Sequence, residues 1–239
     1  MLQIIEIIRK MEQGFTEPYL CRAEDDELYV IKRLNATFSG LIKEWIAASL
    51  GKEFGLPIPD FKLVYVDSSL LEYDNELRHN IGAGIAFASK LVGDLQEVTY
   101  SDLLGGESDL LKSIFMFDYW IKNDDRNLSE MAGNPNLFLS QSTKKIIVLD
   151  HNLSFDKDFD LNSFKDIHVG AQAFKANVDM LLQDEFAPKF SHALSKLDEI
   201  VAQIPEDWKE DFDNYDDFLD EIRVILSSFE QTNFWEVLI

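Results

Sequence analysis

The chain of 239 residues changes character near residue 95, and this change restricts the folds that it can adopt. Before that point, short apolar runs are separated by turn-forming Gly, Pro, Asn and Asp, as in strands joined by turns. Beyond it, apolar residues recur mostly at helical spacing. The pattern predicts an α+β fold in which a small, antiparallel, β-rich N-terminal lobe (1–95) precedes a mostly α-helical C-terminal lobe (96–239).

The first lobe is expected to hold a small sheet and one helix. Its apolar opening, residues 1–12, suits either a helix or a strand. The helix is expected over residues 39–54, with Ser39 as its N-cap and Gly55 at its end. The polar residues 68–82 are expected to form a loop. Strands are expected at 19–23, 27–33, 61–66 and 83–91.

The second lobe begins with a strongly apolar segment, residues 108–122, which predicts a buried helix. Two short strands are expected next, at 137–139 and 145–149, joined by a polar turn at 140–144. From about residue 170 the pattern is helical. Near the end, acidic residues alternate with aromatic ones, which is typical of amphipathic helices with an acidic outer face.

Charge and cysteine content limit the classes of function. The formal net charge of -22 would repel nucleic acids and anionic membranes, so neither is expected as a direct partner. It would also repel ATP, so an ATP site in this chain needs local positive charge and a bound divalent metal. One cysteine, Cys21, cannot form an internal disulfide, and Glu6 interrupts the apolar start, unlike in a secretory signal. A cytoplasmic location is therefore expected.

Lys32 ends an apolar strand on which it shares one face with Leu28 and Val30, because side chains alternate along a strand. A lysine beyond a valine that would cover an adenine ring suits a phosphate-binding position. A solvated lysine on an edge strand is the alternative. Glu44, on the following helix, lies on a face of small residues and is the natural ion-pair partner of Lys32. The alternative is a glutamate that faces solvent.

Asp125 lies in a polar segment between the apolar helix and the first of the two short strands. Phosphoryl transfer needs a carboxylate near the attacking hydroxyl, and Asp125 would orient that hydroxyl and accept its proton. Asn136, just ahead of the strand, would ligate magnesium through its side-chain oxygen. The alternative is a polar loop whose residues simply favour turns.

Asp150 directly follows the second short strand, in the sequence Val148-Leu149-Asp150-His151. A carboxylate at this position is well placed to bind a metal, although an aspartate that caps a strand end is an ordinary alternative. A hairpin from Asn136 to Asp150 would bring its two ends together, so that both side chains share one magnesium ion. His151 is expected to orient Asp150 or to stabilise the turn that follows.

Taken in order, these segments resemble the HipA-like kinases, in particular their short stand-alone members. No piece is specific alone, but the order and spacing of the pieces form a fairly specific set over roughly residues 10 to 155. The matching pieces are Gly14–Pro18, Tyr29–Lys32, the helix with Glu44 followed by Gly55–Pro59, Trp120–Arg126, Asn134–Leu137 and Leu149–His151.

The resemblance implies a bilobal, protein-kinase-like fold that binds ATP and Mg²⁺. It implies that Lys32 holds phosphates and pairs with Glu44, that Asp125 is the catalytic aspartate, and that Asn136 and Asp150 ligate the metal. Proteins similar to this one phosphorylate serine or threonine on a protein substrate, and some are toxins of toxin–antitoxin pairs, which would make an antitoxin or another regulator a partner.

The resemblance also places Gly14 and Thr16 in a loop over the phosphates, where Thr16 is the candidate for a phosphorylated hydroxyl. The chain departs from the family after Arg126, where Asn127 stands in place of a frequent histidine. An insertion then delays the magnesium-ligating asparagine, which leaves Asn134 and Asn136 as alternatives.

Three functions are compatible with these residues. The first is an active Ser/Thr protein kinase, and the second is a kinase of small molecules or lipids, which related folds also include. The third is a pseudokinase or an acidic protein-interaction module without catalysis. Retention of Lys32, Asp125 and Asp150 argues against the third.

Overall fold

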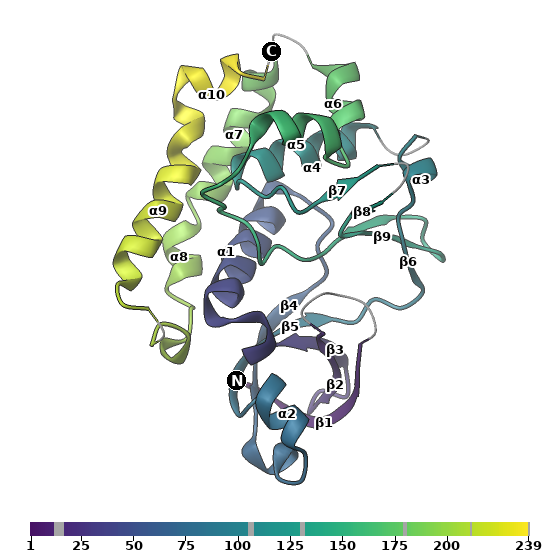
Figure 1. The fold of residues 1–239 in the computed structure, drawn as a ribbon, viewed down its shortest axis with the longest axis vertical. Helices are drawn as coiled ribbons and strands as arrows, with labels where there is room; N and C mark the ends of the chain where they lie inside the picture. The colour runs from purple at the N-terminus through teal and green to yellow at the C-terminus, as the bar shows by residue number, and fades with distance from the viewer. Residues whose placement is uncertain (12–16, 105–107, 130–131, 179–180, 211, 239) are drawn as a thin grey trace.

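The computed structural model describes residues 1–11, 17–104, 108–129, 132–178, 181–210 and 212–238. A β-barrel lies at one end of the long axis and most helices lie toward the other, with α1 (Phe38–Phe54) running between them (Figure 1). The N-terminus lies beside the barrel, and the C-terminus lies at the opposite end. The predicted α+β content, with strands concentrated early and helices late, is confirmed.

Five strands close into the barrel in the order β1-β2-β3-β5-β4. The 1–12 opening is a strand, and neighbouring strands are antiparallel as predicted, except that β1 and β4 run parallel, with Leu2 opposite Val64. This pairing closes the sheet and leaves it without an exposed edge. The strands are β1 (Leu2–Lys10), β2 (Tyr19–Ala23), β3 (Leu28–Lys32), β4 (Phe61–Val66) and β5 (Gly84–Lys90).

Helix α1 has the predicted end and a different start. Gly55 ends it as predicted, because its φ of 99° lies in the left-handed region that glycine adopts without strain. Its N-cap is Thr37 rather than Ser39, since the Thr37 hydroxyl accepts a hydrogen bond from the Gly40 amide at 3.1 Å. The helix is buried on most of its surface, which includes the face with the small residues.

The prediction of a loop over residues 68–82 is wrong. This segment contains a 3₁₀ helix (Ser68–Leu71) and the short helix α2 (Asn75–Asn80). Asp74 caps α2 by accepting hydrogen bonds from the amides of Glu76 and Leu77. None of the residues of α2 is buried, so the apolar periodicity that marks a packed helix is missing from its sequence.

Two short strands of the later part form the predicted hairpin, and a third, unpredicted strand joins it in the order β10-β9-β6. Two further strands, β7 and β8, pair within the segment that follows Arg126. The elements are β6 (Leu95–Glu97), α3 (Tyr100–Leu104), α4 (Ser108–Trp120), β7 (Asn127–Leu128), β8 (Gly133–Asn134), β9 (Leu137–Ser140), β10 (Ile146–Val148), α5 (Leu161–Ile167), α6 (Ala171–Asn177), α7 (Leu182–Leu194), α8 (Leu197–Val201), a 3₁₀ helix (Glu206–Trp208), α9 (Tyr215–Ser227), a 3₁₀ helix (Ser228–Glu230) and α10 (Thr232–Glu236).

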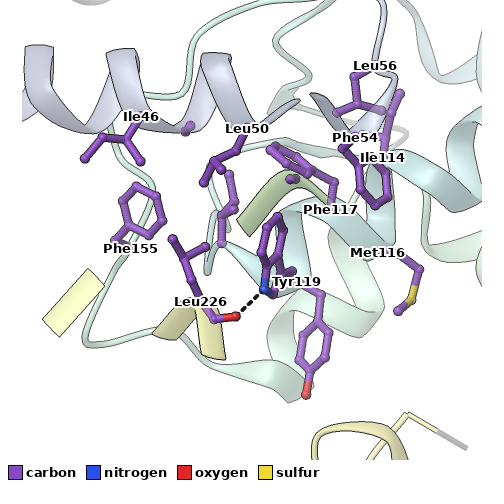
Figure 2. Packing of buried hydrophobic residues seen from close by; sticks show 14 of the residues in the cluster. Ile46, Leu50, Phe54, Leu56, Ile114, Met116, Phe117, Tyr119, Phe155 and Leu226 are labelled. Atoms are coloured by element: carbon purple, nitrogen blue, oxygen red, sulfur yellow. Dashed lines mark hydrogen bonds between the residues drawn. The ribbon is translucent and has the colours of Figure 1, made fainter. Parts of the chain in front are cut away.

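The buried apolar residues form two clusters. One fills the barrel, and the other joins α1 to the later helices. Figure 2 shows Leu50 and Phe54 of α1 beside Phe117 of α4, and Tyr119 and Leu226 in the same cluster. Helix α1 therefore precedes residue 95 in sequence but shares its core with elements that follow it. In the part of the chain described here, no helix has the length and apolarity to cross a membrane.

Candidate active site between the barrel and the β9–β10 hairpin

A cleft of about 360 Å³ separates the barrel from the β9–β10 hairpin. Val30 and Lys32 of β3 line it from the barrel side, and Glu44 lines it from α1. Asn136 and Asp150, at the open end of the hairpin, line it from the opposite side. The five residues come from β3, from α1 and from the two ends of the hairpin, and all of them face one cavity.

Lys32 bridges two carboxylates in this cleft. Its Nζ lies 2.9 Å from Oε2 of Glu44 and 2.8 Å from Oδ1 of Asp150. Burial lowers the pKa of Lys32, but the negative charges of Asp150 and Glu44 outweigh burial and raise the pKa above its ordinary value. The ammonium group therefore stays charged at neutral pH. Since β3 lies between β2 and β5 and Lys32 is buried, the alternative of a solvated edge-strand lysine is wrong.

Glu44 is 3% exposed, so the alternative of a solvent-facing glutamate is wrong. Its Oε1 accepts a hydrogen bond from the His151 amide at 3.1 Å and lies 3.4 Å from Nδ1 of that ring. Burial alone would raise the pKa of Glu44, whereas Lys32 and His151 together hold it below its usual range. The His151 ring thus contacts Glu44 rather than Asp150. The backbone carbonyl of His151 accepts a hydrogen bond from the Ser154 amide. This bond supports the turn that follows, which is the other role predicted for His151.

Asp125 is half-buried and accepts two side-chain amide hydrogens. Its Oδ2 lies 2.8 Å from Nδ2 of Asn136 and 2.9 Å from Nδ2 of Asn134. Both asparagines that the sequence left open therefore contact Asp125. Asn136 is buried, and its carbonyl accepts from the Leu149 amide at 3.1 Å, whereas Asn134 is exposed. Asn136 is thus the asparagine held beside the end of β10.

The hairpin between Asn136 and Asp150 has the predicted form, with Leu137 opposite Val148. Asn136 and Asp150 have φ values of 45° and 58°. Residues other than glycine seldom adopt this left-handed region, and such strained residues concentrate at functional sites. Because the amide nitrogen of Asn136 faces Asp125, its amide oxygen is the atom that a cation would contact.

The oxygen atoms at this end of the hairpin suit magnesium. Mg²⁺ prefers oxygen ligands and is commonly held by one or two side chains together with phosphate oxygens and water. Asn136 and Asp150 offer one amide oxygen and one carboxylate from neighbouring positions. No three His, Cys, Asp or Glu side chains of the described ranges are grouped to hold a metal, so a cation here would need further ligands from phosphate or water.

Two residues predicted for the phosphate loop, Gly14 and Thr16, lie outside the described residues. Met11 and Pro18, which precede and follow them in sequence, both line the cleft. The amide of Met11 donates to the carbonyl of Pro18 at 2.8 Å, so the two ends of this segment are held together at the cleft. The predicted roles of Gly14 and Thr16 stay predictions.

Comparison with known proteins identifies the family. The model of the HipA-like kinase family matches residues 4–238, nearly the whole chain. The chain belongs to the HipA-like kinase family. Membership of this family supports phosphotransferase activity. No curated protein matches the sequence significantly.

Solved structures similar to this HipA-like kinase are protein kinases in fold. The crystal structure of CtkA, a proinflammatory kinase of Helicobacter pylori, matches with a TM-score of 0.55 at 12% identity, over 94% of this chain and 92% of that one. The Golgi casein kinase with Mn and ADP bound matches with a TM-score of 0.56 at 12% identity, over 96% and 72% of the two chains. At this identity the likeness establishes the fold, which is protein-kinase-like.

In this member of the HipA-like kinase family, the fully buried Arg126 connects the segment that carries Asp125 to the hairpin. Its Nη1 donates to the carbonyl of Asn136 at 2.6 Å and to that of Leu149 at 3.0 Å. Its Nη2 lies 3.4 Å from the carbonyl of Asp150. One guanidinium thus holds the backbone of both candidate metal ligands. The sequence assigned Arg126 no role, although it adjoins Asp125.

The charge of Arg126 is balanced by Asp118, which the sequence analysis missed. Oδ2 of Asp118 lies 2.7 Å from Nε of Arg126, and its Oδ1 accepts from the amide of Asn123. Burial raises the pKa of Asp118, but the charge of Arg126 and the hydrogen bond from His168 lower it to about 2. The available signal was a carboxylate within the otherwise apolar run 114–121.

His168 completes this buried network. Its Nε2 lies 3.0 Å from Oδ2 of Asp118, and its Nδ1 accepts a hydrogen bond from the Gly170 amide. Because Nδ1 is an acceptor, the proton of the neutral ring is on Nε2, where it faces the carboxylate. His168, the C-cap of α5, is thus a core residue that supports the segment carrying Asp125.

Proposed function

We propose that this chain is an ATP- and Mg²⁺-dependent kinase that phosphorylates serine or threonine on protein substrates. The observation that carries the proposal is the convergence of Lys32, Asn136 and Asp150 on one cleft of a kinase-like fold, with Asp125 hydrogen-bonded to Asn136. The Golgi casein kinase, which shares this fold, was solved with Mn and ADP, and this supports a nucleotide and a divalent metal here.

Each side chain has a task that its surroundings suit. Lys32 would bind the phosphates, and Glu44 would hold its ammonium group in place. Val30 would contact the adenine ring. Asn136 and Asp150 would hold Mg²⁺, which neutralises the charge that develops on the transferred phosphoryl group.

Asp125 would orient the acceptor hydroxyl and take its proton. Its carboxylate is held by two amide N–H groups, from Asn134 and Asn136, which fix its orientation without neutralising its charge. In this arrangement the barrel (within residues 1–95) and the helical part (within 96–239) would act as two lobes on either side of the nucleotide, with Gly14 and Thr16 over the phosphates.

Incubation of the purified protein with labelled ATP and Mg²⁺ tests the assignment of Asp125. Asp125→Asn should lower incorporation of label into protein by about 10²-fold or more, because general-base catalysis contributes on that scale. Asp124→Asn is the matched control, since Asp124 is the neighbouring, half-buried carboxylate outside the predicted roles. Equal incorporation by wild type and Asp125→Asn would overturn the assignment.

The acceptor class is tested in cells that express either the wild type or Asp150→Ala. We expect phosphoserine and phosphothreonine sites that are present with the wild type and absent with the variant. Phosphate found only on a metabolite or a lipid would favour a small-molecule or lipid kinase instead. If neither proteins nor small molecules are phosphorylated and the protein does not bind ATP, a pseudokinase or an acidic interaction module would be favoured.

A toxin-type role, with an antitoxin or another regulatory partner, is part of the proposal because of the family resemblance. Expression of the wild type should then slow growth, and Asp150→Ala should not. Growth that is the same with both forms would remove the toxin role while leaving the kinase assignment intact. A cytoplasmic location is proposed together with this role.

A further inference from the structure

Helix α1, which carries Glu44, is held mainly by helices from late in the chain. Nε1 of Trp45 donates a buried hydrogen bond of 3.1 Å to the carbonyl of Ile200 in α8. Phe54, the last residue of α1, stacks on Phe186 and Phe190 of α7. The position of Glu44 in the cleft therefore depends on residues that lie more than 130 positions further along the chain.

Lys32 lies on β3, whose Tyr29 and Ile31 belong to the other apolar cluster, inside the barrel. The Lys32–Glu44 pair thus connects two parts of the molecule that are packed around separate cores. An ion pair across such a boundary keeps its geometry only if other contacts fix the two parts relative to each other. Phe87 of the barrel packs in the cluster that contains α1 and provides part of this contact. Trp45 and Trp208 provide two further contacts.

Trp45 makes the first contact, because its ring meets Phe61 of β4 edge to face, with centroids 5.4 Å apart, while its N–H reaches α8. Trp208 makes the second contact. It is fully buried in the 3₁₀ helix after α8, and its Nε1 donates to the carbonyl of Ile85 in β5 at 2.9 Å.

An ion pair lies next to the second contact. Arg33, the residue after Lys32, has its Nη2 3.7 Å from Oδ2 of Asp207. The guanidinium of Arg33 also donates through Nε to the carbonyl of Ile85, which Trp208 shares. Residues 197–208 therefore contact α1 on one side and the barrel, immediately beside Lys32, on the other.

We propose that Trp45 and Trp208 are positioning residues for phosphoryl transfer. Through them, residues 197–208 hold α1 against the barrel, so that Lys32 and Glu44 are paired before any nucleotide or partner binds. This inference rests on the proposed function of the Lys32–Glu44 pair. It adds that the C-terminal helices supply the contact that keeps this pair assembled.

The test compares Trp208→Phe with Trp235→Phe. Both substitutions keep an aromatic ring and remove one indole hydrogen bond, which Trp235 donates to the carbonyl of Phe229 at 2.7 Å. Neither Trp235 nor Phe229 lies in the barrel or in α1. If Trp208 only stabilised the fold, the two substitutions would have the same effect on hydrogen exchange and on kinetics.

The first measurement is amide hydrogen exchange of the protein without nucleotide. Trp208→Phe should speed exchange about fivefold in β3 and at the His151 amide, which donates to Glu44, because loss of one hydrogen bond weakens protection on that scale. Trp235→Phe should leave these amides unchanged. Equal exchange at these positions in both variants would overturn the proposal.

The second measurement is the kinetics of phosphoryl transfer. Trp208→Phe should raise KM for ATP about fivefold, and Trp235→Phe should change it less than twofold. In a Glu44→Gln background, Trp208→Phe should add no further change, because it acts through Glu44; an additive change would count against the proposal. If the wild type neither binds ATP nor transfers phosphate, the proposed function fails, while the exchange experiment still decides the role of Trp208.

Discussion

At the scale of single residues, the buried ion pair between Arg126 and Asp118 supports the site most directly. We predict that Asp118→Asn destabilises the protein by about 3–5 kcal/mol, since breaking a buried pair leaves the charge of Arg126 uncompensated. Urea unfolding measures this change, with Asp124→Asn as a half-buried control expected within about 0.5 kcal/mol of wild type. Equal midpoints for the two variants would show that the pair contributes nothing.

The low pKa of Asp118 also predicts a specific dependence of stability on pH. Its pKa is lowered from 3.8 to about 2 in the folded state, so the stabilisation is complete above about pH 4 and is lost as the pH falls toward 2. The shift corresponds to about 2 kcal/mol. Unfolding measured between pH 5 and pH 2 should show this loss for the wild type and a shallower loss for Asp118→Asn. Parallel curves for the two proteins would contradict it.

The candidate site could largely be predicted from the sequence, because its polar side chains lie at the ends of local elements. Asp150 follows a strand, and a hairpin necessarily returns that end to Asn136. The supporting network was not accessible, since Asp118 and His168 lie 50 positions apart and meet through helix packing alone. Whether Glu44 faces solvent could not be predicted from the sequence either, because its exposure depends on what packs on α1.

At the scale of elements, the N-cap of α1 offers a prediction that separates the two candidate caps. Thr37→Ala should lower stability by about 1 kcal/mol, since the Gly40 amide loses its acceptor. Thr37→Ser keeps the hydroxyl and Ser39→Ala leaves the cap intact, so both should stay within about 0.5 kcal/mol of wild type. Thermal unfolding of the four proteins measures the difference. A larger loss for Ser39→Ala would reverse the assignment.

The close approach of α6 to α4 depends on Gly170. A Cβ at this position would collide with the Leu111 carbonyl and would lie 2.9 Å from Cβ of Phe115. Gly170→Ala should therefore destabilise the protein by about 1–3 kcal/mol through overpacking. Gly93→Ala is the matched control, because a Cβ there meets nothing within 4 Å. Chemical denaturation that ranks the two variants equally would contradict this packing.

Elements were predicted where the signal is local and missed where it depends on a distant partner. Gly55 and the strand-forming residues 61–66 are local signals, and both gave the observed boundaries. The parallel pairing of β1 with β4 joins strands more than 50 residues apart, and nothing within either strand encodes it. Ser39 was predicted as the N-cap from its residue type, whereas Thr37 is the residue whose hydroxyl accepts the Gly40 amide.

At the scale of the whole molecule, nucleotide binding should stabilise the fold only when a divalent metal is present. The net charge of -22 opposes a free nucleotide, and Asn136 and Asp150 would need the metal to approach phosphate. ATP with Mg²⁺ at 100 times its dissociation constant should add about 2.7 kcal/mol to the free energy of unfolding. Thermal unfolding with ATP and either Mg²⁺ or EDTA tests this. An equal shift in EDTA would contradict the metal site.

The dependence of α1 on late helices also affects how the chain is synthesised. Trp45 and Ile200 are 155 residues apart, so at 5–20 residues per second α1 waits roughly 8–30 seconds on the ribosome for its partner. During this time its apolar surface lacks the native cover of α7 and α8, which makes the nascent chain a substrate for chaperones. The Lys32–Glu44 pair is secured only once nearly the whole chain has been translated. Incomplete or truncated chains that lack residues 197–208 therefore lack the contacts by which Trp45 and Trp208 would keep the Lys32–Glu44 pair assembled.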